Sequence, residues 1–311
     1  MNTQLAFLFP GQGSQSVGML ADLGDRATVR DTFAEASEVL GYDLWALSQD
    51  GPEADLNQTD RTQPAMLAAG VAVWRLWREQ AGAEPCVMAG HSLGEYSALV
   101  CADAIDFAAA VDLVAERGRL MQAAVPAGEG AMAAILGLED AQVVAVCEQA
   151  AQGEVVSAAN FNSPGQVVVA GSAAAVDRAV ALATEAGAKK AVKLAVSVPS
   201  HCALMRPAAE QLALKLASIE VRTPRIPVFH NADVVAYDDA DRIRDALARQ
   251  LYQSVRWVET VQKLAADGIV SAIEAGPGKV LMGLNRRIDR NVKTTPVLDT
   301  DSLAKALAEQ S

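Results

Sequence analysis

A serine stands between two glycines in residues 90–94, whose sequence is Gly-His-Ser-Leu-Gly. An apolar run at residues 86–89 precedes this segment, and a helical pattern at 95–101 follows it. Glycines two positions on either side of a serine allow a sharp turn from strand to helix, which exposes the hydroxyl at the helix N-terminus. The segment therefore predicts a nucleophile elbow, with Ser92 as the nucleophile and the amide of Leu93 facing the group under attack.

An unactivated serine is a poor nucleophile, so the chain must also supply a base. Its three histidines are His91, His201 and His230. His91 adjoins Ser92 inside the predicted turn, and we expect it to pack or to support the oxyanion side. His201 follows a Pro-Ser pair in a loop and is our candidate base. A structural or solvated histidine is the alternative for His201.

A Ser-His-acid triad requires a carboxylate that this chain lacks at the expected place. Residues 191–200 contain no Asp or Glu, although the α/β-hydrolase order puts the acid between serine and histidine. Asp140, Asp177 and Glu185 fall in helical patterns. A backbone carbonyl can hold the imidazole tautomer instead, with less stabilisation of the imidazolium than a carboxylate gives.

A glycine-rich loop at residues 10–15 follows the first apolar run. Its amides are candidates for a second oxyanion donor opposite Leu93. A phosphate-binding loop and a plain turn are the alternatives. The Gly-Lys-Ser/Thr of a P-loop is absent, and two glycines separated by one residue are weak evidence for a dinucleotide site.

Arg117 lies in an otherwise apolar helical pattern with Gly118 beside it. The small neighbour allows close packing and indicates that the arginine points inward, where a guanidinium requires an anion. Its planar fork matches a carboxylate in a two-point contact. From the residues alone two interpretations stay open: an external carboxylate, or a structural ion pair with Glu116 or another internal acid.

Composition excludes several classes of partner. The 311 residues include 26 Lys and Arg against 38 Asp and Glu, and the net charge of −12 disfavours nucleic acid and anionic lipid. No apolar stretch reaches the roughly 20 residues that cross a bilayer, and we recognise no signal peptide, so we expect a cytoplasmic protein. The four cysteines lack C-x-x-C spacing, and we expect neither a metal site nor disulfides.

Strand-like apolar runs alternate with helical patterns along most of the chain. The strand-like runs are residues 5–9, 86–89, 228–229, 269–273 and 296–298, and the clearest helical patterns are 64–82, 106–124 and 242–252. This alternation predicts an α/β fold, a parallel sheet with helices on both faces.

Residues 131–196 break that rhythm. Their pattern is a strand (131–136), a helix (139–152), two strands joined at residues 163–165, a helix (173–186) and a strand (190–196). This βαββαβ order is ferredoxin-like. We therefore predict a large domain of residues 1–128 and 198–311, with a small domain of residues 129–197 inserted into it and a ligand cleft between the two.

Six segments resemble, in order, motifs of the malonyl-CoA:acyl carrier protein transacylases. They are residues 9–15, 90–95, 117, 160–166, 198–201 and 274–278, and they extend through nearly the whole chain. The resemblance implies an α/β-hydrolase-like large domain with a ferredoxin-like small domain. It also implies an S-malonyltransferase that moves malonyl from CoA to the phosphopantetheine thiol of acyl carrier protein through a malonyl-serine, without a further cofactor.

The resemblance assigns a role to each candidate residue. By this likeness Ser92 carries the acyl group, His201 is the base and Arg117 binds the malonyl carboxylate. The amides of Gln12 and Leu93 form the oxyanion hole.

The same likeness makes a backbone carbonyl at Gln250 the group that orients the histidine, in place of the missing acid. The chain departs from the family nearby, because Ser254 follows Tyr252 and Gln253 where a proline would be expected. His230 stands where asparagine is more usual, which adds a titratable group near the cleft or a packed histidine.

The carrier protein implied by the resemblance is acidic, like this chain, so local basic runs are the candidate docking surfaces. They are Lys189 with Lys190, and Arg286 with Arg287. Ordinary solvated faces are the alternative, and a monomer is our default expectation.

Two other functions fit the elbow. A serine thioesterase or esterase predicts release of free malonate without carrier protein, and Arg117 and the missing triad acid argue against it. A non-catalytic carrier-binding module is disfavoured by the presence of both Ser92 and His201.

Overall fold

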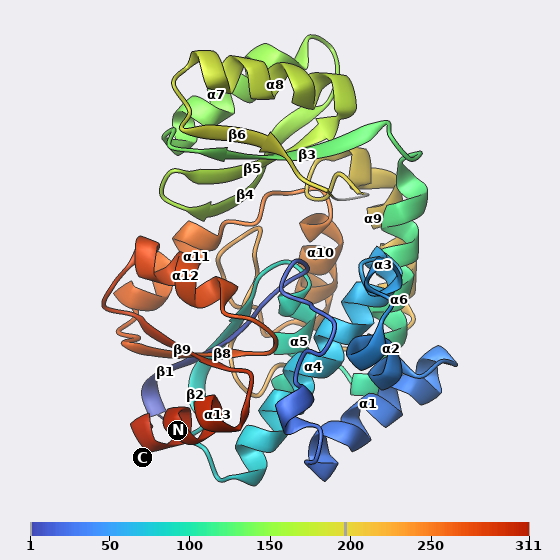
Figure 1. Ribbon diagram of the computed structural model, residues 1–311, viewed down its shortest axis with the longest axis vertical. Helices are drawn as coiled ribbons and strands as arrows, with labels where there is room; N and C mark the ends of the chain where they lie inside the picture. Colours follow the sequence, from blue (N-terminus) through green and yellow to red (C-terminus); the bar gives the residue numbers. More distant parts are fainter. Residues whose placement is uncertain (1, 196–197, 311) are drawn as a thin grey trace.

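The computed structural model describes residues 2–195 and 198–310, and its larger part is built on a parallel sheet (Figure 1). The five strands lie in the order β7-β2-β1-β8-β9 and all pair in parallel. They are β1 (Asn2–Phe9), β2 (Pro85–Gly90), β7 (Val228–Phe229), β8 (Ser271–Ala275) and β9 (Lys293–Val297). The predicted α/β class with a parallel sheet is confirmed.

Side chains of β1 alternate between two apolar cores, as the pleat of a strand requires. Phe7 and Phe9 pack into the larger core with the long buried helix α4 (Thr59–Glu79), whereas Ala6 and Leu8 pack into a second core on the other face. The larger core also includes α1 (Ala27–Leu40), α2 (Leu44–Asp50), α3 (Glu53–Leu56), α5 (Gly94–Cys101), α6 (Phe107–Ala124), α9 (Arg206–Ala217), α10 (Ala240–Gln250) and α13 (Thr300–Glu309). Helices α11 (Trp257–Ala266) and α12 (Val280–Ile288) cover the second core, so helices flank both faces.

A second sheet forms the small domain at the top of Figure 1. Its antiparallel strands are β3 (Gly130–Leu136), β4 (Val156–Ser163), β5 (Gln166–Ser172) and β6 (Lys190–Lys193), in the order β4-β5-β3-β6. Helices α7 (Asp140–Ala151) and α8 (Ala173–Glu185) pack on one face of this sheet. The βαββαβ order and the strand order are those of a ferredoxin-like unit.

The predicted end of the last small-domain strand and the predicted domain boundary fall on Val196 and Ser197, which lie outside the described residues. The division into residues 1–128 with 198–311 and 129–197 therefore stays a prediction. Within the described ranges, no helix is long and apolar enough to cross a membrane. The same residues hold no cluster of three His, Cys, Asp or Glu side chains suited to a metal ion, and among them Cys101, Cys147 and Cys202 are buried thiols outside any disulfide.

The small domain lies over the carboxyl ends of the strands of the large sheet (Figure 1). Asn160 of β4 forms a parallel bridge with Val255, which follows α10. The hydroxyl of Ser254 donates to the carbonyl oxygen of Ala158 at 2.6 Å, so this departure from the family pattern links the segment after α10 to β4 of the small domain. The carboxyl edge of a parallel sheet, closed by a second unit, is a common place for a ligand.

Candidate active site

The turn between β2 and α5 has the geometry of a nucleophile elbow. Ser92 adopts φ +50°, in the left-handed region that side chains other than glycine rarely enter. A Cβ atom on Gly90 would lie 1.8 Å from the carbonyl carbon of Gly94, and one on Gly94 would lie 2.0 Å from the carbonyl oxygen of Phe9. Both glycines are therefore required for the close approach that lifts the Ser92 hydroxyl above the sheet.

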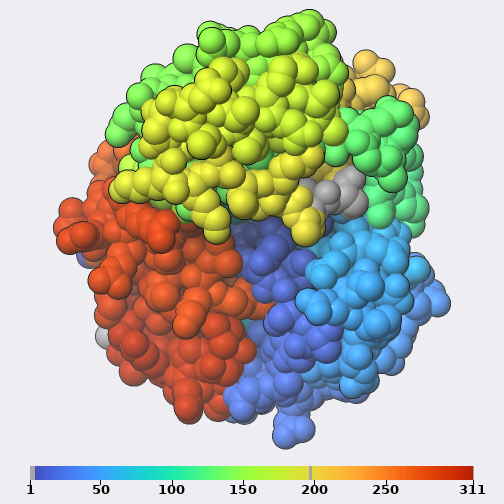
Figure 2. Space-filling view, turned by 45° about the horizontal axis from the view of Figure 1, so that its top comes forward, coloured from blue at the N-terminus to red at the C-terminus, as the bar shows by residue number. Residues whose placement is uncertain are grey.

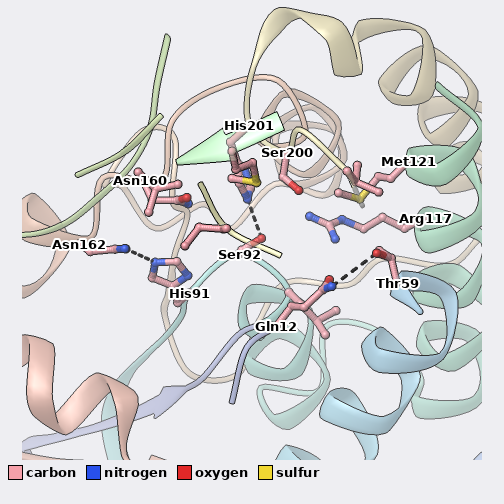
Figure 3. Close-up of a pocket in the computed structure, with 15 residues that line it drawn as sticks. Gln12, Thr59, His91, Ser92, Arg117, Met121, Asn160, Asn162, Ser200 and His201 are labelled. Carbon is pink, nitrogen blue, oxygen red and sulfur yellow. Dashed lines mark hydrogen bonds between the residues drawn. The ribbon is translucent and has the colours of Figure 1, made fainter. Parts of the chain in front are cut away.

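The structure brings Ser92 and His201 together from segments more than 100 residues apart (Figure 3). Ser92 Oγ lies 2.7 Å from His201 Nε2, and His201 Nδ1 lies 2.7 Å from the carbonyl oxygen of Gln250. Because a carbonyl only accepts, Nδ1 must carry the proton, which leaves Nε2 free to accept the proton of the hydroxyl. The backbone N–H of His201 donates to the carbonyl oxygen of Leu251 at 2.9 Å and holds the loop against the end of α10.

His201 is 3% exposed. Burial, and next the positive charge of Arg117, lower the pKa of His201 to about 3, although the bond to the Gln250 carbonyl opposes the shift. The imidazole is therefore neutral at physiological pH, which is the form that can take a proton from serine.

Arg117, from α6, is buried and points into the same cavity (Figure 3). Its Nη1 donates to Gln63 Oε1 at 2.8 Å and its Nη2 donates to Gln250 Oε1 at 3.0 Å. Glu116, an alternative partner considered from the sequence, instead pairs with Arg119 near the surface at 2.8 Å. The buried guanidinium is thus held by neutral amides and lacks a carboxylate in direct contact among the described residues.

The guanidinium of Arg117 has five N–H groups. The side chains of Gln63 and Gln250 accept from two of them. Its Nε is buried without a partner among the described side chains. Burial lowers the pKa of Arg117, whereas Tyr96 and Glu95 raise it, and the group stays a cation. A buried cation with unused donors is suited to an anion that arrives from outside.

The cavity that contains these groups has a volume of about 230 Å³. Arg117 is the one formal charge among the described residues that line it, because its histidines are neutral. Its apolar wall consists of Leu93, Met121, Met132, Val168, Leu194 and Val198. A cavity of this size and lining is suited to a small acyl group that carries one negative charge.

The loop after β1 lies directly against the elbow. A Cβ atom on Gly11 would lie 2.5 Å from the carbonyl oxygen of His91. Gln12 and Leu93 both line the cavity, and within the described part of the chain neither backbone N–H has an acceptor. Two such amides beside a nucleophile are suited to stabilising an oxyanion.

His91 packs away from the reacting serine. Its Nε2 lies 2.8 Å from Asn162 Oδ1, which links the elbow to β4 (Figure 3), and burial lowers its pKa. His230, considered from the sequence as a titratable group near the cleft, is buried and does not line the cavity. Its Nδ1 lies 2.7 Å from Glu95 Oε1.

Glu95, Asn231 and Gln63 are site residues that sequence reasoning missed. Glu95 is a fully buried carboxylate beneath the elbow, and it accepts from the backbone N–H of Asn231 at 2.9 Å and from Gln250 Nε2 at 2.8 Å. A glutamate directly after the second glycine of the elbow, in an otherwise apolar helix, was the available signal for Glu95. Gln63 and Asn231 had no comparable signal.

Comparisons with known proteins show the family of the chain. A family model described as an acyl transferase domain matches residues 6–300. The malonyl CoA-acyl carrier protein transacylase of Escherichia coli (strain K12) is 58% identical over 306 residues, which cover 98% of this chain and 99% of that protein. The Haemophilus influenzae protein of the same name is 59% identical over 301 residues, 96% of each chain.

Solved structures agree closely as well. The crystal structure of an acyl carrier protein S-malonyltransferase from Vibrio cholerae has a TM-score of 0.96 and 62% identity, and the match covers 97% of this chain and 99% of that one. A malonyl-transacylase in complex with its type II PKS acyl-carrier protein has a TM-score of 0.97 and 56% identity, covering 98% and 99%. The chain belongs to the malonyl CoA-acyl carrier protein transacylase family.

Proposed function

We propose that this protein transfers a malonyl group from CoA to the phosphopantetheine thiol of an acyl carrier protein, through an acyl-enzyme at Ser92, as a monomer in the cytoplasm. One observation carries the proposal: the Ser92–His201 pair, 2.7 Å apart, shares a cavity with the unpaired guanidinium of Arg117. A malonyl thioester matches both features: its carbonyl carbon is an electrophile for Ser92, and its free carboxylate is an anion for Arg117.

In the first half-reaction, Ser92 Oγ attacks the thioester carbonyl carbon while His201 Nε2 takes the hydroxyl proton. The amides of Gln12 and Leu93 donate to the negative oxygen of the tetrahedral intermediate. The carbon–sulfur bond then breaks, His201 returns the proton to the departing CoA sulfur, and malonyl-serine remains.

In the second half-reaction, the pantetheine thiol of the carrier gives its proton to His201 and attacks malonyl-serine. The negative charge forms on the same oxygen, so the same two amides serve both steps. Collapse of the intermediate returns Ser92 Oγ as the leaving group, protonated by His201. Transfer must outrun hydrolysis, which requires that the cavity limit access of water.

Arg117 supplies the specificity. Gln63 and Gln250 hold the guanidinium, and its remaining N–H groups are available to bind a carboxylate. An acyl group without a terminal carboxylate leaves that buried cation without an anion, which disfavours acetyl against malonyl.

We place the docking surface for the carrier on one basic edge, composed of Lys189, Lys190, Arg286 and Arg287. All four residues are exposed, and the structure gives none of them an ion pair within the described ranges. Arg287 Nη1 donates to Gln166 Oε1 at 2.8 Å and so joins α12 to the start of β5. Figure 2 shows the end of the small domain (yellow) against the C-terminal segment (red). Complementary charge on an acidic carrier would favour docking there.

The proposal is tested by the intact mass of the protein after brief exposure to malonyl-CoA, followed by peptide mapping. We expect one added malonyl group on the peptide that contains Ser92, and none in Ser92→Ala. Free malonate produced without carrier protein, at a rate comparable to transfer, would instead establish a thioesterase. Absence of both an adduct and free malonate would contradict hydrolase and transferase chemistry at Ser92.

A further inference from the structure

Two side-chain amides hold the peptide groups on either side of Ser92. Asn231 Oδ1 accepts from the N–H of Ser92 at 2.6 Å, and Asn231 Nδ2 donates to the carbonyl oxygen of Gly90 at 2.6 Å. On the other side, Gln250 Nε2 donates to the carbonyl oxygen of Ser92 at 2.9 Å. The peptide before a residue defines φ and the peptide after it defines ψ, so the two amides together restrain both backbone torsions of the nucleophile.

Both residues are tied to one buried carboxylate, Asn231 through its backbone and Gln250 through its side chain. Glu95 Oε2 accepts from the backbone N–H of Asn231 at 2.9 Å and from Gln250 Nε2 at 2.8 Å, while Oε1 lies 2.7 Å from His230 Nδ1. Glu95, Asn231, Gln250 and His230 are each at most 1% exposed. Because water does not reach these groups, it cannot replace a bond that is lost among them.

Ser92 needs such restraint because of its backbone conformation. A left-handed φ in a residue with a side chain persists only where the surroundings hold it. The peptide that follows Ser92 also carries the N–H of Leu93, the proposed oxyanion donor. A rotation of the Ser92 backbone would therefore move Oγ away from His201 Nε2 and, in the same motion, turn the Leu93 donor.

We propose that Asn231 is a positioning residue for acylation: it keeps Ser92 in the left-handed conformation in which Oγ meets His201 Nε2, with Glu95 as its anchor. Asn231 does not line the cavity, so it acts through Ser92 and not on the substrate. This inference rests on the proposed function, because it assumes that Ser92 carries the malonyl group.

Asn231→Ala removes both side-chain contacts and leaves Arg117 and His201 in place. We expect the single-turnover rate of malonyl-serine formation to fall about 100-fold, the order of loss typical of a misplaced reacting group. The Kd of malonyl-CoA, measured on Ser92→Ala with and without the Asn231→Ala change, should stay within about twofold because the carboxylate site is untouched.

Asn285→Ala is the matched control. Asn285 is equally buried and also makes two side-chain hydrogen bonds, accepting from Trp257 Nε1 and donating to Thr294 Oγ1, both at 3.0 Å. It lies between α11, α12 and β9 and does not line the cavity. We expect it to lower thermal stability as Asn231→Ala does, with the acylation rate unchanged.

An acylation rate in Asn231→Ala within about threefold of wild type, or an equal loss in Asn285→Ala, would overturn the inference. If the alanine variant fails to fold, the isosteric Asn231→Asp provides the test, because it keeps an acceptor for Ser92 N–H but loses the donor to Gly90. Slower acylation at unchanged Kd supports the inference, and a wild-type rate overturns it. Wild-type protein that acquires no malonyl group would refute the proposed function instead.

Discussion

His201 Nδ1 and the carbonyl oxygen of Gln250 lie 2.7 Å apart, where a Ser-His-acid triad would have a carboxylate. The carbonyl fixes the tautomer, but it provides no negative charge to stabilise the imidazolium that forms as Ser92 attacks. Arg117 adds a positive charge that disfavours that imidazolium. A malonyl carboxylate bound to Arg117 would offset this charge and would make His201 a stronger base.

The pH dependence of acylation follows from that arrangement. Burial and Arg117 lower the pKa of His201 to about 3, so His201 becomes protonated, and unable to accept the serine proton, only as the pH falls far below 6.5. The second-order rate constant for malonyl-serine formation at low malonyl-CoA, which reports the free protein, should therefore stay nearly level from pH 7 down to about 5, where an unperturbed histidine would have lost most of its activity.

To measure this profile, the protein is transferred rapidly to each pH and mixed briefly with malonyl-CoA. The intact mass of the protein then gives the amount of malonyl-serine formed. Circular dichroism at each pH verifies that the protein is still folded. An acid limb with an apparent pKa near 6.5 in folded protein would contradict the low pKa of His201.

Arg117→Ala should separate malonyl from acetyl transfer. Removal of the partner of a buried carboxylate costs roughly 2 to 5 kcal/mol, or about 30-fold to a few thousandfold in kcat/KM with malonyl-CoA. Acetyl-CoA has no terminal carboxylate, so its kcat/KM should change little. Steady-state kinetics with both thioesters provide the measurement, and equal losses would make Arg117 a structural residue.

Gln63→Glu tests the same site without removing the arginine. Gln63 Oε1 accepts from Arg117 Nη1 at 2.8 Å, so an isosteric carboxylate there would form an internal ion pair with the guanidinium. This pair competes with the malonyl carboxylate, and kcat/KM for malonyl-CoA should fall about 10- to 100-fold, or roughly 1.4 to 2.7 kcal/mol. Unchanged malonyl kinetics in a folded variant would mean that Arg117 does not bind the substrate carboxylate.

The parts of this site that sequence reasoning could predict are those that depend on adjacent residues. The glycines around Ser92 specify the elbow locally, and a short choice of histidines leads to His201. Glu95 and His230 meet across 135 positions of the chain, and the contact of Arg117 with Gln250 spans 133. Such pairings depend on how helices pack, which the pattern of a single segment does not contain.

Element types were predictable for a similar reason, whereas their ends were not. Apolar composition placed a strand at residues 269–273, but β8 is Ser271–Ala275, because Ile269 N–H instead closes the end of α11 on the carbonyl oxygen of Leu264. Strand β9 begins at Lys293, whereas the apolar run predicted a strand only at residues 296–298. The first residues of β9 are polar, so the apolar pattern did not indicate them. Helix α4 begins at Thr59, before Pro64, which lies inside it.

Gly94→Ala should abolish acylation through the backbone alone. The added Cβ would lie 2.0 Å from the carbonyl oxygen of Phe9, so the elbow must move away from β1. We expect a loss of at least 100-fold in the rate of malonyl-serine formation and a lower melting temperature.

Gly283→Ala, in α12, is the control variant. Its added Cβ would meet nothing within 4 Å, so the change should stabilise the fold by up to about 1 kcal/mol and leave full activity. Intact mass and thermal unfolding distinguish the two, and a fully active Gly94→Ala would contradict the close approach.

Charge reversal on the basic edge should separate the two half-reactions. Two double variants place negative charge on the proposed docking surface for the acidic carrier: Lys189→Glu with Lys190→Glu, and Arg286→Glu with Arg287→Glu. None of these residues lines the cavity. Formation of malonyl-serine should be unchanged, while kcat/KM for the carrier should fall about 10-fold or more at low salt. The loss should shrink as salt is added, because screening weakens the charge interaction in both wild type and variants. Carrier kinetics equal to wild type in both double variants would place the docking surface elsewhere.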